Sequence, residues 1–140
     1  MKELKVVAGI IVCGDEILCL QRGKGKYDYV SFKYEFPGGK IEAGETPVEA
    51  LQRELTEELE IQVNVYEKDF FMNVQHDYPD FSINMFSYIC RVESKEFKLK
   101  EHFSYQWLKR GEIDSLAWLP ADEPIVKKLK REDALEAAKC

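Results

Sequence analysis

The chain has 140 residues, of which 45% are hydrophobic and 33% charged, and its net charge is −6 at pH 7. This length suits one domain with a full hydrophobic core, and a pI of about 5.1 argues against long-range attraction to a nucleic-acid polymer. The sequence shows no signal peptide, lipidation motif or apolar run of membrane length. We therefore expect a cytoplasmic protein with no membrane partner.

The first part of the chain predicts a β-hairpin followed by a loop. Two apolar, β-branched runs, Leu4–Val12 and Ile17–Gln21, flank a turn at Cys13-Gly14-Asp15-Glu16. The polar segment Lys24–Tyr29 lies next to glycines and indicates a loop. Phe32–Phe36 then leads into a predicted glycine turn at residues 37–39.

The next segment predicts an amphipathic helix. Thr46 is a favourable N-cap, Pro47 suits the first helical position, and Glu49 completes a capping box. At about 100° per residue, four apolar side chains fall on one stripe that must face a core. They are Val48, Leu51, Leu55 and Leu59.

The second half of the chain predicts further strands and a closing helix. Gln62–Asn73 and Ile83–Val92 suit two strands joined by the turn-rich segment 77–80, and Tyr105–Leu108 suits a short strand. We expect residues 111–119 to form a connector or helical turn, and Pro124–Lys130 or beyond to form the last helix. We expect one domain over residues 1–131, with residues 132–140 as a tail or an extension of that helix.

Another face of the predicted central helix collects carboxylates. Glu54, Glu57 and Glu58 fall within an arc of roughly 100°, Arg53 borders them, and Glu45 can reach the same patch. Like charges at these spacings destabilise a helix by a few tenths of a kcal/mol per pair. The patch is either a solvated acidic surface or a site where a hard cation such as Mg²⁺ compensates the charges.

The order of residues from Gly39 to Ile61 resembles the Nudix box. That pattern is Gly, five residues, Glu, seven residues, Arg-Glu, an apolar residue, any residue, Glu-Glu, any residue, Gly and an apolar residue. The matching positions are Gly39, Glu45, Arg53, Glu54, Leu55, Glu57, Glu58 and Ile61. Glu60 stands where the family has glycine, at a helix end that often needs φ > 0, where a side chain costs about 1–2 kcal/mol. The resemblance implies an α/β (α+β) Nudix fold, with a mixed β-sheet between α-helices.

A hydrolase that cleaves a polyphosphate needs an activated water and compensation of growing negative charge, and a metal supplies both. The resemblance implies Mg²⁺, or Mn²⁺ in its place, with two or more ions per site. The expected ligands are the Gly39 carbonyl, Glu54, Glu57 and Glu58, with Glu45 or Glu101 completing the set. Arg53 is expected to orient the carboxylates by fork-like hydrogen bonds. Proton removal is assigned to Glu54, Glu57 or Glu101, with no choice among them.

Two segments resemble the MutT-like nucleoside triphosphate pyrophosphohydrolases, residues 35–46 and 119–125. In those enzymes the position of Asp122 contacts the base, and an aspartate there matches the CTP pyrophosphohydrolase type. An ionised carboxylate only accepts hydrogen bonds, which favours a base with an amine, cytosine before adenine. The alternative is that Asp122 only caps the last helix, with Pro124 in its first turn.

Four other residues are weaker candidates. Arg22 resembles a position that binds triphosphate or sugar, and Lys40 is a plausible phosphate contact; an exposed arginine without such a role is the alternative for Arg22. Phe36 could flank a base or equally lie in the core, whereas we expect Trp118 to lie in the core. Glu101, in a predicted loop, is either a metal ligand or base, as the resemblance implies, or a surface charge.

The predicted reaction is hydrolysis of a (deoxy)nucleoside triphosphate to a monophosphate and pyrophosphate. The expected substrate is CTP, dCTP or a modified pyrimidine form, and the alternative is 8-oxo-dGTP. A less favoured reading is a Nudix hydrolase of another diphosphate such as ADP-ribose. A non-catalytic nucleotide-binding domain is disfavoured because every box glutamate is present. The expected partner is the nucleotide alone, bound by a monomer or homodimer, without nucleic-acid polymer.

Overall fold

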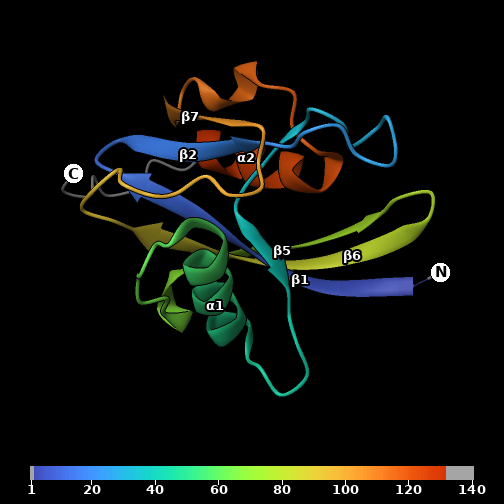
Figure 1. The fold of residues 1–140 in the computed structure, drawn as a ribbon, viewed down its shortest axis with the longest axis horizontal. Helices are drawn as coiled ribbons and strands as arrows, with labels where there is room; N and C mark the ends of the chain where they lie inside the picture. Colours follow the sequence, from blue (N-terminus) through green and yellow to red (C-terminus); the bar gives the residue numbers. More distant parts are fainter. Residues whose placement is uncertain (1, 132–140) are drawn as a thin grey trace.

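β1 (Lys2–Cys13) is the longest strand and lies at the centre of the sheet (Figure 1). It pairs in parallel with β6 (Phe81–Arg91) along most of its length and antiparallel with β2 (Glu16–Gln21). The predicted hairpin is confirmed, and Gly14 in its turn has a φ of 64°, which glycine adopts without strain. The computed structural model describes residues 2–131, where the main strand order is β3-β2-β1-β6-β5.

Four shorter strands complete the sheet. They are β3 (Tyr34–Glu35), β4 (Gly38–Lys40), β5 (Phe70–Asp77) and β7 (Ser104–Lys109). β3 and β7 pair with β2, β4 pairs with β1, and β5 pairs with β6, all antiparallel. Because β1 and β6 run parallel among these antiparallel pairs, the sheet is mixed, as the sequence predicted.

Two α-helices cover the two faces of this sheet, α1 (Pro47–Leu59) and α2 (Glu123–Arg131) (Figure 1). Successive residues of a strand point to opposite faces, so β1 supplies a core to each helix. Ile10 belongs to the cluster that contains Ile125 of α2, whereas Ile11 belongs to the cluster that contains Leu55 of α1. The structure thus confirms the predicted α+β architecture and both helices.

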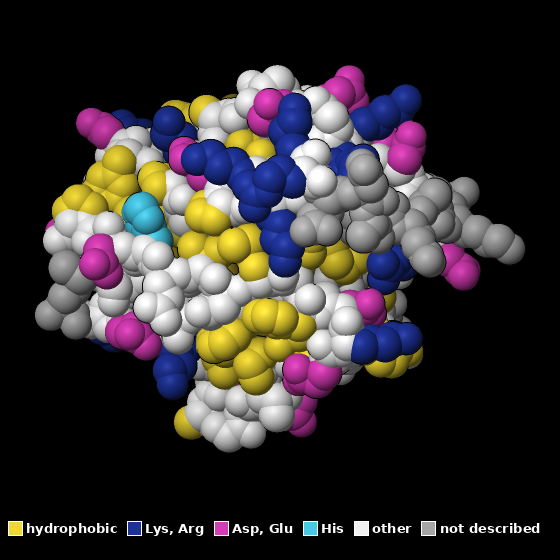
Figure 2. All heavy atoms as spheres, turned by 180° about the vertical axis from the view of Figure 1, so that it is seen from behind, with side chains coloured by type: hydrophobic (Ala, Val, Ile, Leu, Met, Phe, Trp, Pro, Cys, Tyr) yellow, Lys and Arg dark blue, Asp and Glu magenta, His cyan; other side chains and the backbone are white. Residues whose placement is uncertain are grey.

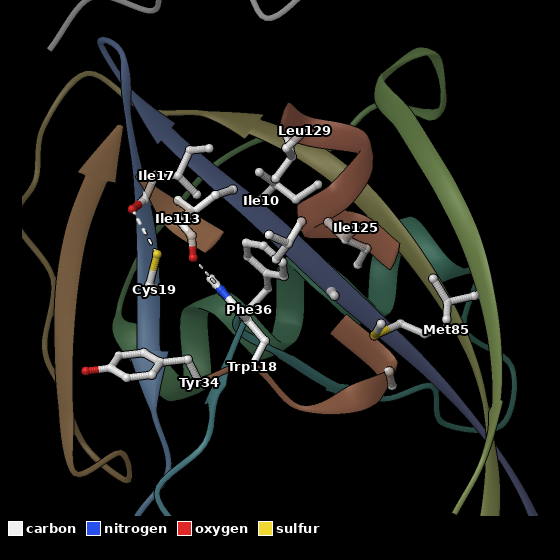
Figure 3. Packing of buried hydrophobic residues seen from close by; sticks show 14 of the residues in the cluster. Ile10, Ile17, Cys19, Tyr34, Phe36, Met85, Ile113, Trp118, Ile125 and Leu129 are labelled. Carbon is white, nitrogen blue, oxygen red and sulfur yellow. Dashed lines mark hydrogen bonds between the residues drawn. The ribbon is translucent and has the colours of Figure 1, made fainter. Parts of the chain in front are cut away.

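The core on the α2 side contains Trp118, as predicted (Figure 3). Its side chain is 5% exposed, and its Nε1 donates a hydrogen bond of 2.6 Å to the carbonyl of Ile113. Ile113 begins a short 3₁₀ turn inside the predicted connector. The indole stacks on Phe36 with 4.5 Å between ring centroids. This stack fixes the connection between β3 and β4, and β4 carries the glycines Gly38 and Gly39.

Both ends of α1 follow from local sequence. The Thr46 hydroxyl accepts from Glu49 N and the Glu49 carboxylate accepts from Thr46 N, which is the predicted capping box. At the other end Glu60 has φ 54° and ψ 35°, so the left-handed conformation is present without a glycine. Ile61 N donates to Leu55 O, which closes the helix end.

The predicted strand Gln62–Asn73 is wrong in its first half. Residues 62–66 have no regular structure, Glu67–Asp69 forms a 3₁₀ turn, and the strand runs from Phe70 to Asp77. Val65 N donates to the side chain of Gln52 on α1, and Val65 is buried against that helix. The apolar residues of this segment therefore serve the α1 core rather than a sheet.

The predicted glycine turn is instead strand β4. Gly39 pairs with Val7, and a Cβ atom at Gly38 would overlap the carbonyl oxygen of Val7. Glycine is required there because two backbones approach closely, rather than because the chain turns.

The face seen from behind shows Lys and Arg side chains gathered near its upper centre (Figure 2). α2 ends with three basic residues, Lys128, Lys130 and Arg131, which suits a helix C-terminus. None of the helices within residues 2–131 is long and apolar enough to cross a bilayer. The predicted tail or helix extension at 132–140 lies outside the described residues.

Candidate active site

A cavity of about 640 Å³ brings most of the sequence-predicted site residues together. It is bordered by β1, β4, the loop after β2, the C-terminal half of α1 and the segment before α2. The predicted residues that line it are Arg22, Phe36, Gly39, Lys40, Glu58, Glu101 and Asp122. Arg53, Glu54 and Glu57 do not line it and form an adjoining network on α1.

Arg53 is the centre of that network. Its Nε and Nη2 donate to the two oxygens of Glu45 at 2.7 and 2.9 Å. Its Nη1 donates to Glu54 at 2.8 Å and to Glu57 at 3.2 Å, and its Nη2 also reaches the carbonyl of Lys40 at 3.0 Å. Since guanidinium geometry is rigid, these bonds fix the carboxylates relative to one another and to β4.

Glu54 lies directly against the backbone of Gly39. A Cβ atom at residue 39 would lie 2.5 Å from Glu54 Oε2 and 2.7 Å from Oε1. The glycine therefore leaves the space in which the carboxylate sits. This contact joins β4 to α1 and places one predicted ligand beside the peptide group of another.

Glu58 lies where negative charge is most concentrated. Burial, followed by the charge and hydrogen bond of Glu54 and the charges of Glu101 and Glu35, raises the pKa of Glu58 to about 8. Carboxylates from α1, β3 and the β6–β7 loop thus converge on one end of the cavity. An ionised carboxylate buried among other carboxylates destabilises the fold unless a proton or a cation compensates its charge.

Asp122 also lines the cavity, with only 4% of its surface exposed. Because the charges that act on it are those of Glu35 and Arg22 and not of Glu54 or Glu101, we infer that it lies at the other end. Its Oδ1 accepts from Phe36 N at 3.5 Å, so its hydrogen bond runs to the β3–β4 connection instead of to the first turn of α2. Burial, followed by the charge of Glu35, raises the pKa of Asp122 well above its usual range, opposed by Phe36 N–H and Arg22. A raised pKa favours the neutral form, whereas the sequence predicted an ionised, acceptor-only carboxylate.

The weaker candidates take different positions. Phe36 is 4% exposed and packs on Trp118, so most of its ring belongs to the core although it borders the cavity. Arg22 follows β2, lines the cavity and pairs with Glu35 at 3.4 Å. Lys40 is exposed at the carboxylate end.

Sequence reasoning missed three residues that the structure brings to the cavity. Glu35 lies between its two ends and accepts from Arg22, and His102 Nε2 lies 2.9 Å from Glu35 Oε2. Tyr78 lines the cavity and its hydroxyl accepts from Ala121 N at 3.1 Å. Glu35 stands within the MutT-like segment, which was a usable signal, whereas no local pattern marked His102 or Tyr78.

Comparison with known proteins identifies the architecture. A model of the NUDIX domain matches residues 3–139. The chain belongs to the Nudix family. It is therefore a Nudix hydrolase, which acts on phosphorus-containing anhydrides, and divalent metals such as Mg²⁺ generally serve this family.

Relatives with named activities resemble this Nudix protein over nearly their whole length. It is 34% identical to an 8-oxo-dGTP diphosphatase of Escherichia coli K12, over 94% of this chain and 99% of the relative. It is 32% identical to a CTP pyrophosphohydrolase of the same organism, over 91% of each chain. The crystal structure of a MutT protein from Methanosarcina mazei Go1 superposes with a TM-score of 0.82, covers 95% and 96% of the two chains and is 22% identical. That last likeness concerns the fold.

The donor set of this Nudix site fits a hard divalent cation. Within residues 2–131 no three His, Cys, Asp or Glu side chains are already assembled as a metal centre. Glu54 and Glu57 instead bond to Arg53, and the raised pKa of Glu58 favours its protonated form. The carboxylates that converge here supply oxygen ligands, which Mg²⁺ prefers, and Gly39 leaves room for the Glu54 carboxylate beside the backbone.

Proposed function

We propose that this Nudix protein hydrolyses a nucleoside triphosphate to a nucleoside monophosphate and pyrophosphate in the presence of Mg²⁺. The supporting observation is that one cavity has converging carboxylates at one end and buried Asp122 at the other. The first end suits a metal-bound polyphosphate, and the second suits a base. The volume of the whole cavity, about 640 Å³, is within the range of small-molecule sites.

The proposed roles divide between the two ends. The Gly39 carbonyl, Glu54, Glu57, Glu58 and Glu101 would hold the cation, which would supply Lewis acidity and a water of lowered pKa. Arg53 holds Glu54 and Glu57 in place through the bonds described above, and Glu45 fixes Arg53. Removal of the proton from the attacking water is assigned to Glu54, Glu57 or Glu101. Arg22 and Lys40 would contact the phosphates.

For the base, we propose 8-oxoguanine first. A neutral Asp122 has one donor and one acceptor, which match O6 and the N7–H that oxidation at C8 creates. Unoxidised guanine presents two acceptors on the same edge, so it cannot satisfy the carbonyl oxygen of a neutral carboxyl. The 8-oxo-dGTP diphosphatase among the relatives supports the same substrate.

A second candidate substrate is CTP or dCTP. The relative named CTP pyrophosphohydrolase supports it, and either form of Asp122 can accept from cytosine N4. Ionised Asp122 would reject uracil, whereas neutral Asp122 would pair with either pyrimidine. The ratio of CTP to UTP hydrolysis therefore depends on the protonation state of Asp122.

The test is pyrophosphate release from 8-oxo-dGTP, dGTP, CTP, dCTP, UTP and dTTP with Mg²⁺ and with EDTA. We expect at least about tenfold higher kcat/KM for 8-oxo-dGTP than for dGTP, because an unpaired buried polar group costs about 1–3 kcal/mol. Glu57→Gln keeps the shape of the side chain and removes its charge, so it should lower kcat by orders of magnitude. Equal rates with EDTA, or near-normal turnover in Glu57→Gln, would reject the metal-dependent mechanism. A product pair of two monophosphates from ADP-ribose, without pyrophosphate release, would reject the triphosphate assignment.

We also propose a location, an oligomeric state and a set of partners for the enzyme. The enzyme acts on free nucleotides in the cytoplasm, as a monomer or homodimer, and does not bind nucleic-acid polymer or membranes. The net charge of −6 supports this, since a long polyanion is repelled at a distance while a small nucleotide can arrive with its metal.

A further inference from the structure

The loop between β6 and β7 carries Glu101 to the carboxylate end of the cavity. Before it reaches Glu101, this loop is bonded to the C-terminal end of α1. Lys98 N donates to Leu59 O at 2.9 Å, and Lys100 Nζ donates to Glu57 O at 3.3 Å. Both acceptors are carbonyls of the last helical turn, which have no partner inside the helix.

Glu60 strengthens this attachment through its side chain. Glu60 Oε2 lies 3.0 Å from Lys100 Nζ, and Oε1 lies 3.7 Å from Lys98 Nζ. Glu60 is also the residue that replaces the glycine of the Nudix motif, and it is held at φ 54°, where a side chain is strained. Glycine would remove the strain and also both ion pairs. Glutamate in place of glycine therefore strains the end of α1 but adds two ion pairs with the loop.

On the other side of Glu101 the same loop is bonded to the sheet. His102 Nε2 lies 2.9 Å from Glu35 Oε2 on β3, and Phe103 N donates to Gln21 O at 2.8 Å. Glu101 is thus a single residue between two fixed points, one on α1 and one on the sheet. Its charge acts on Glu58, which places it within electrostatic reach of the α1 carboxylates.

We propose that Glu60 is a positioning residue that holds Glu101 at the carboxylate end of the cavity by fixing Lys98 and Lys100 to α1. The inference rests on the proposed function, because it assigns to Glu101 a part in hydrolysis. Surface ion pairs contribute little alone, but these two act together with two bonds to helix carbonyls. Loss of the Glu60 carboxylate removes both ion pairs and weakens the attachment of the loop to α1, where the hydrogen bonds of Lys98 N and Lys100 Nζ remain.

The kinetic test compares two variants that remove the same ion pair from opposite ends. Glu60→Gly also relieves the left-handed strain, whereas Lys100→Met keeps that strain and most of the side-chain length. We expect both to lower kcat about tenfold, since a small displacement at the reacting centre can cost on the order of 10²-fold, while KM for the nucleotide changes less than about twofold. The melting temperature of Glu60→Gly should equal or exceed that of the wild type. The control is Lys130→Met, which removes a 2.9 Å ion pair with Asp114 and should leave kcat unchanged.

Two further measurements separate positioning from a general structural effect. Hydrogen exchange should accelerate at Lys98–Phe103 in Glu60→Gly, with protection of β1 and β6 retained. In a Glu101→Gln background, Glu60→Gly should have no further effect on kcat, because the residue that it positions has lost its role. Unchanged loop exchange, or an equal fall in kcat in both backgrounds, would overturn the inference. A wild-type protein that hydrolyses no triphosphate would instead reject the proposed function, and loop exchange would still test the attachment itself.

Discussion

The carboxylate of Glu54 occupies the space where a Cβ atom of residue 39 would lie, so Gly39 and Glu54 form one structural unit across β4 and α1. The atoms that a new methyl group would meet are at the far end of a flexible side chain. Residue 39 can therefore accept alanine only if the Glu54 carboxylate moves away from β4.

Gly39→Ala should accordingly separate activity from stability. We expect kcat to fall at least about tenfold, because the displaced Glu54 leaves the geometry that Arg53 imposes. The free energy of unfolding should change by less than about 1 kcal/mol, since alanine also restricts the unfolded chain. Gly111→Ala is the control, with no atom within 4 Å of the added methyl group. Full activity of Gly39→Ala would show that the position of Glu54 is not critical.

Arg53→Lys should impair both the site and the fold. Lysine retains the charge but cannot make the paired bonds to Glu45 while it also reaches Glu54, Glu57 and Lys40. We expect the free energy of unfolding to fall by about 1–3 kcal/mol and kcat to fall by about 10²-fold. Urea unfolding and steady-state kinetics measure the two effects. A variant with normal kcat would contradict the orienting role of the guanidinium.

The stability of the metal-free protein should decrease with rising pH. Burial and the charge of Glu54 raise the pKa of Glu58 to about 8, so the folded state binds its proton more tightly than the unfolded chain. The resulting stabilisation is complete below about pH 4.5 and is lost as the pH rises through 8. Melting temperatures in EDTA should thus fall between pH 6 and 9.

Two variations of this experiment identify the source of the slope. Glu58→Gln should flatten it in part, because Asp122, whose pKa is also raised, contributes with the same sign. Added Mg²⁺ should restore stability at pH 9, since a ligand that binds the folded state stabilises it. Melting temperatures that rise with pH in EDTA would contradict the proposed convergence of carboxylates.

Asp122→Asn should remove a pH dependence of substrate binding. The raised pKa favours the neutral carboxyl in the wild type, and the match to 8-oxoguanine is lost as the pH rises through that pKa. The asparagine side chain has an NH₂ group that donates and a carbonyl oxygen that accepts at every pH. KM for 8-oxo-dGTP should therefore rise in the wild type as the pH passes the pKa of Asp122 and stay flat in Asp122→Asn. If KM changes equally with pH in both proteins, Asp122 does not recognise the base by hydrogen bonding.

Local patterns predicted those features that depend on neighbours in sequence. Thr46 and Glu49 form their capping box within one helical turn, and the apolar stripe of α1 follows from helix periodicity. The spacing from Arg53 to Glu57 likewise places the network on one helix face. Such predictions succeed because the interacting groups are fixed by backbone geometry alone.

Contacts between distant segments could not be predicted in this way. Glu35 and His102 are 67 residues apart and meet because the β6–β7 loop packs beside β3. The segment that includes Val65 has strand-like composition, yet it packs beneath α1 because Gln52 accepts its backbone hydrogen bond. In both cases the partner was decided by packing rather than by local preference.

Patterns in the sequence predicted the family, the α+β architecture, the helix that carries the carboxylates and several of the residues that line the cavity. Tertiary structure alone decided the chemical state of those residues. The pKa of Asp122 is raised because α2, β3 and the aromatic core remove water from it and place Glu35 nearby. Glu60 could be recognised from the sequence as a departure from the motif, but its link to Glu101 needed the loop in place. The pKa of Asp122 and the link from Glu60 to Glu101 both depend on burial and on charges from distant segments. The order of neighbouring residues does not encode either of them.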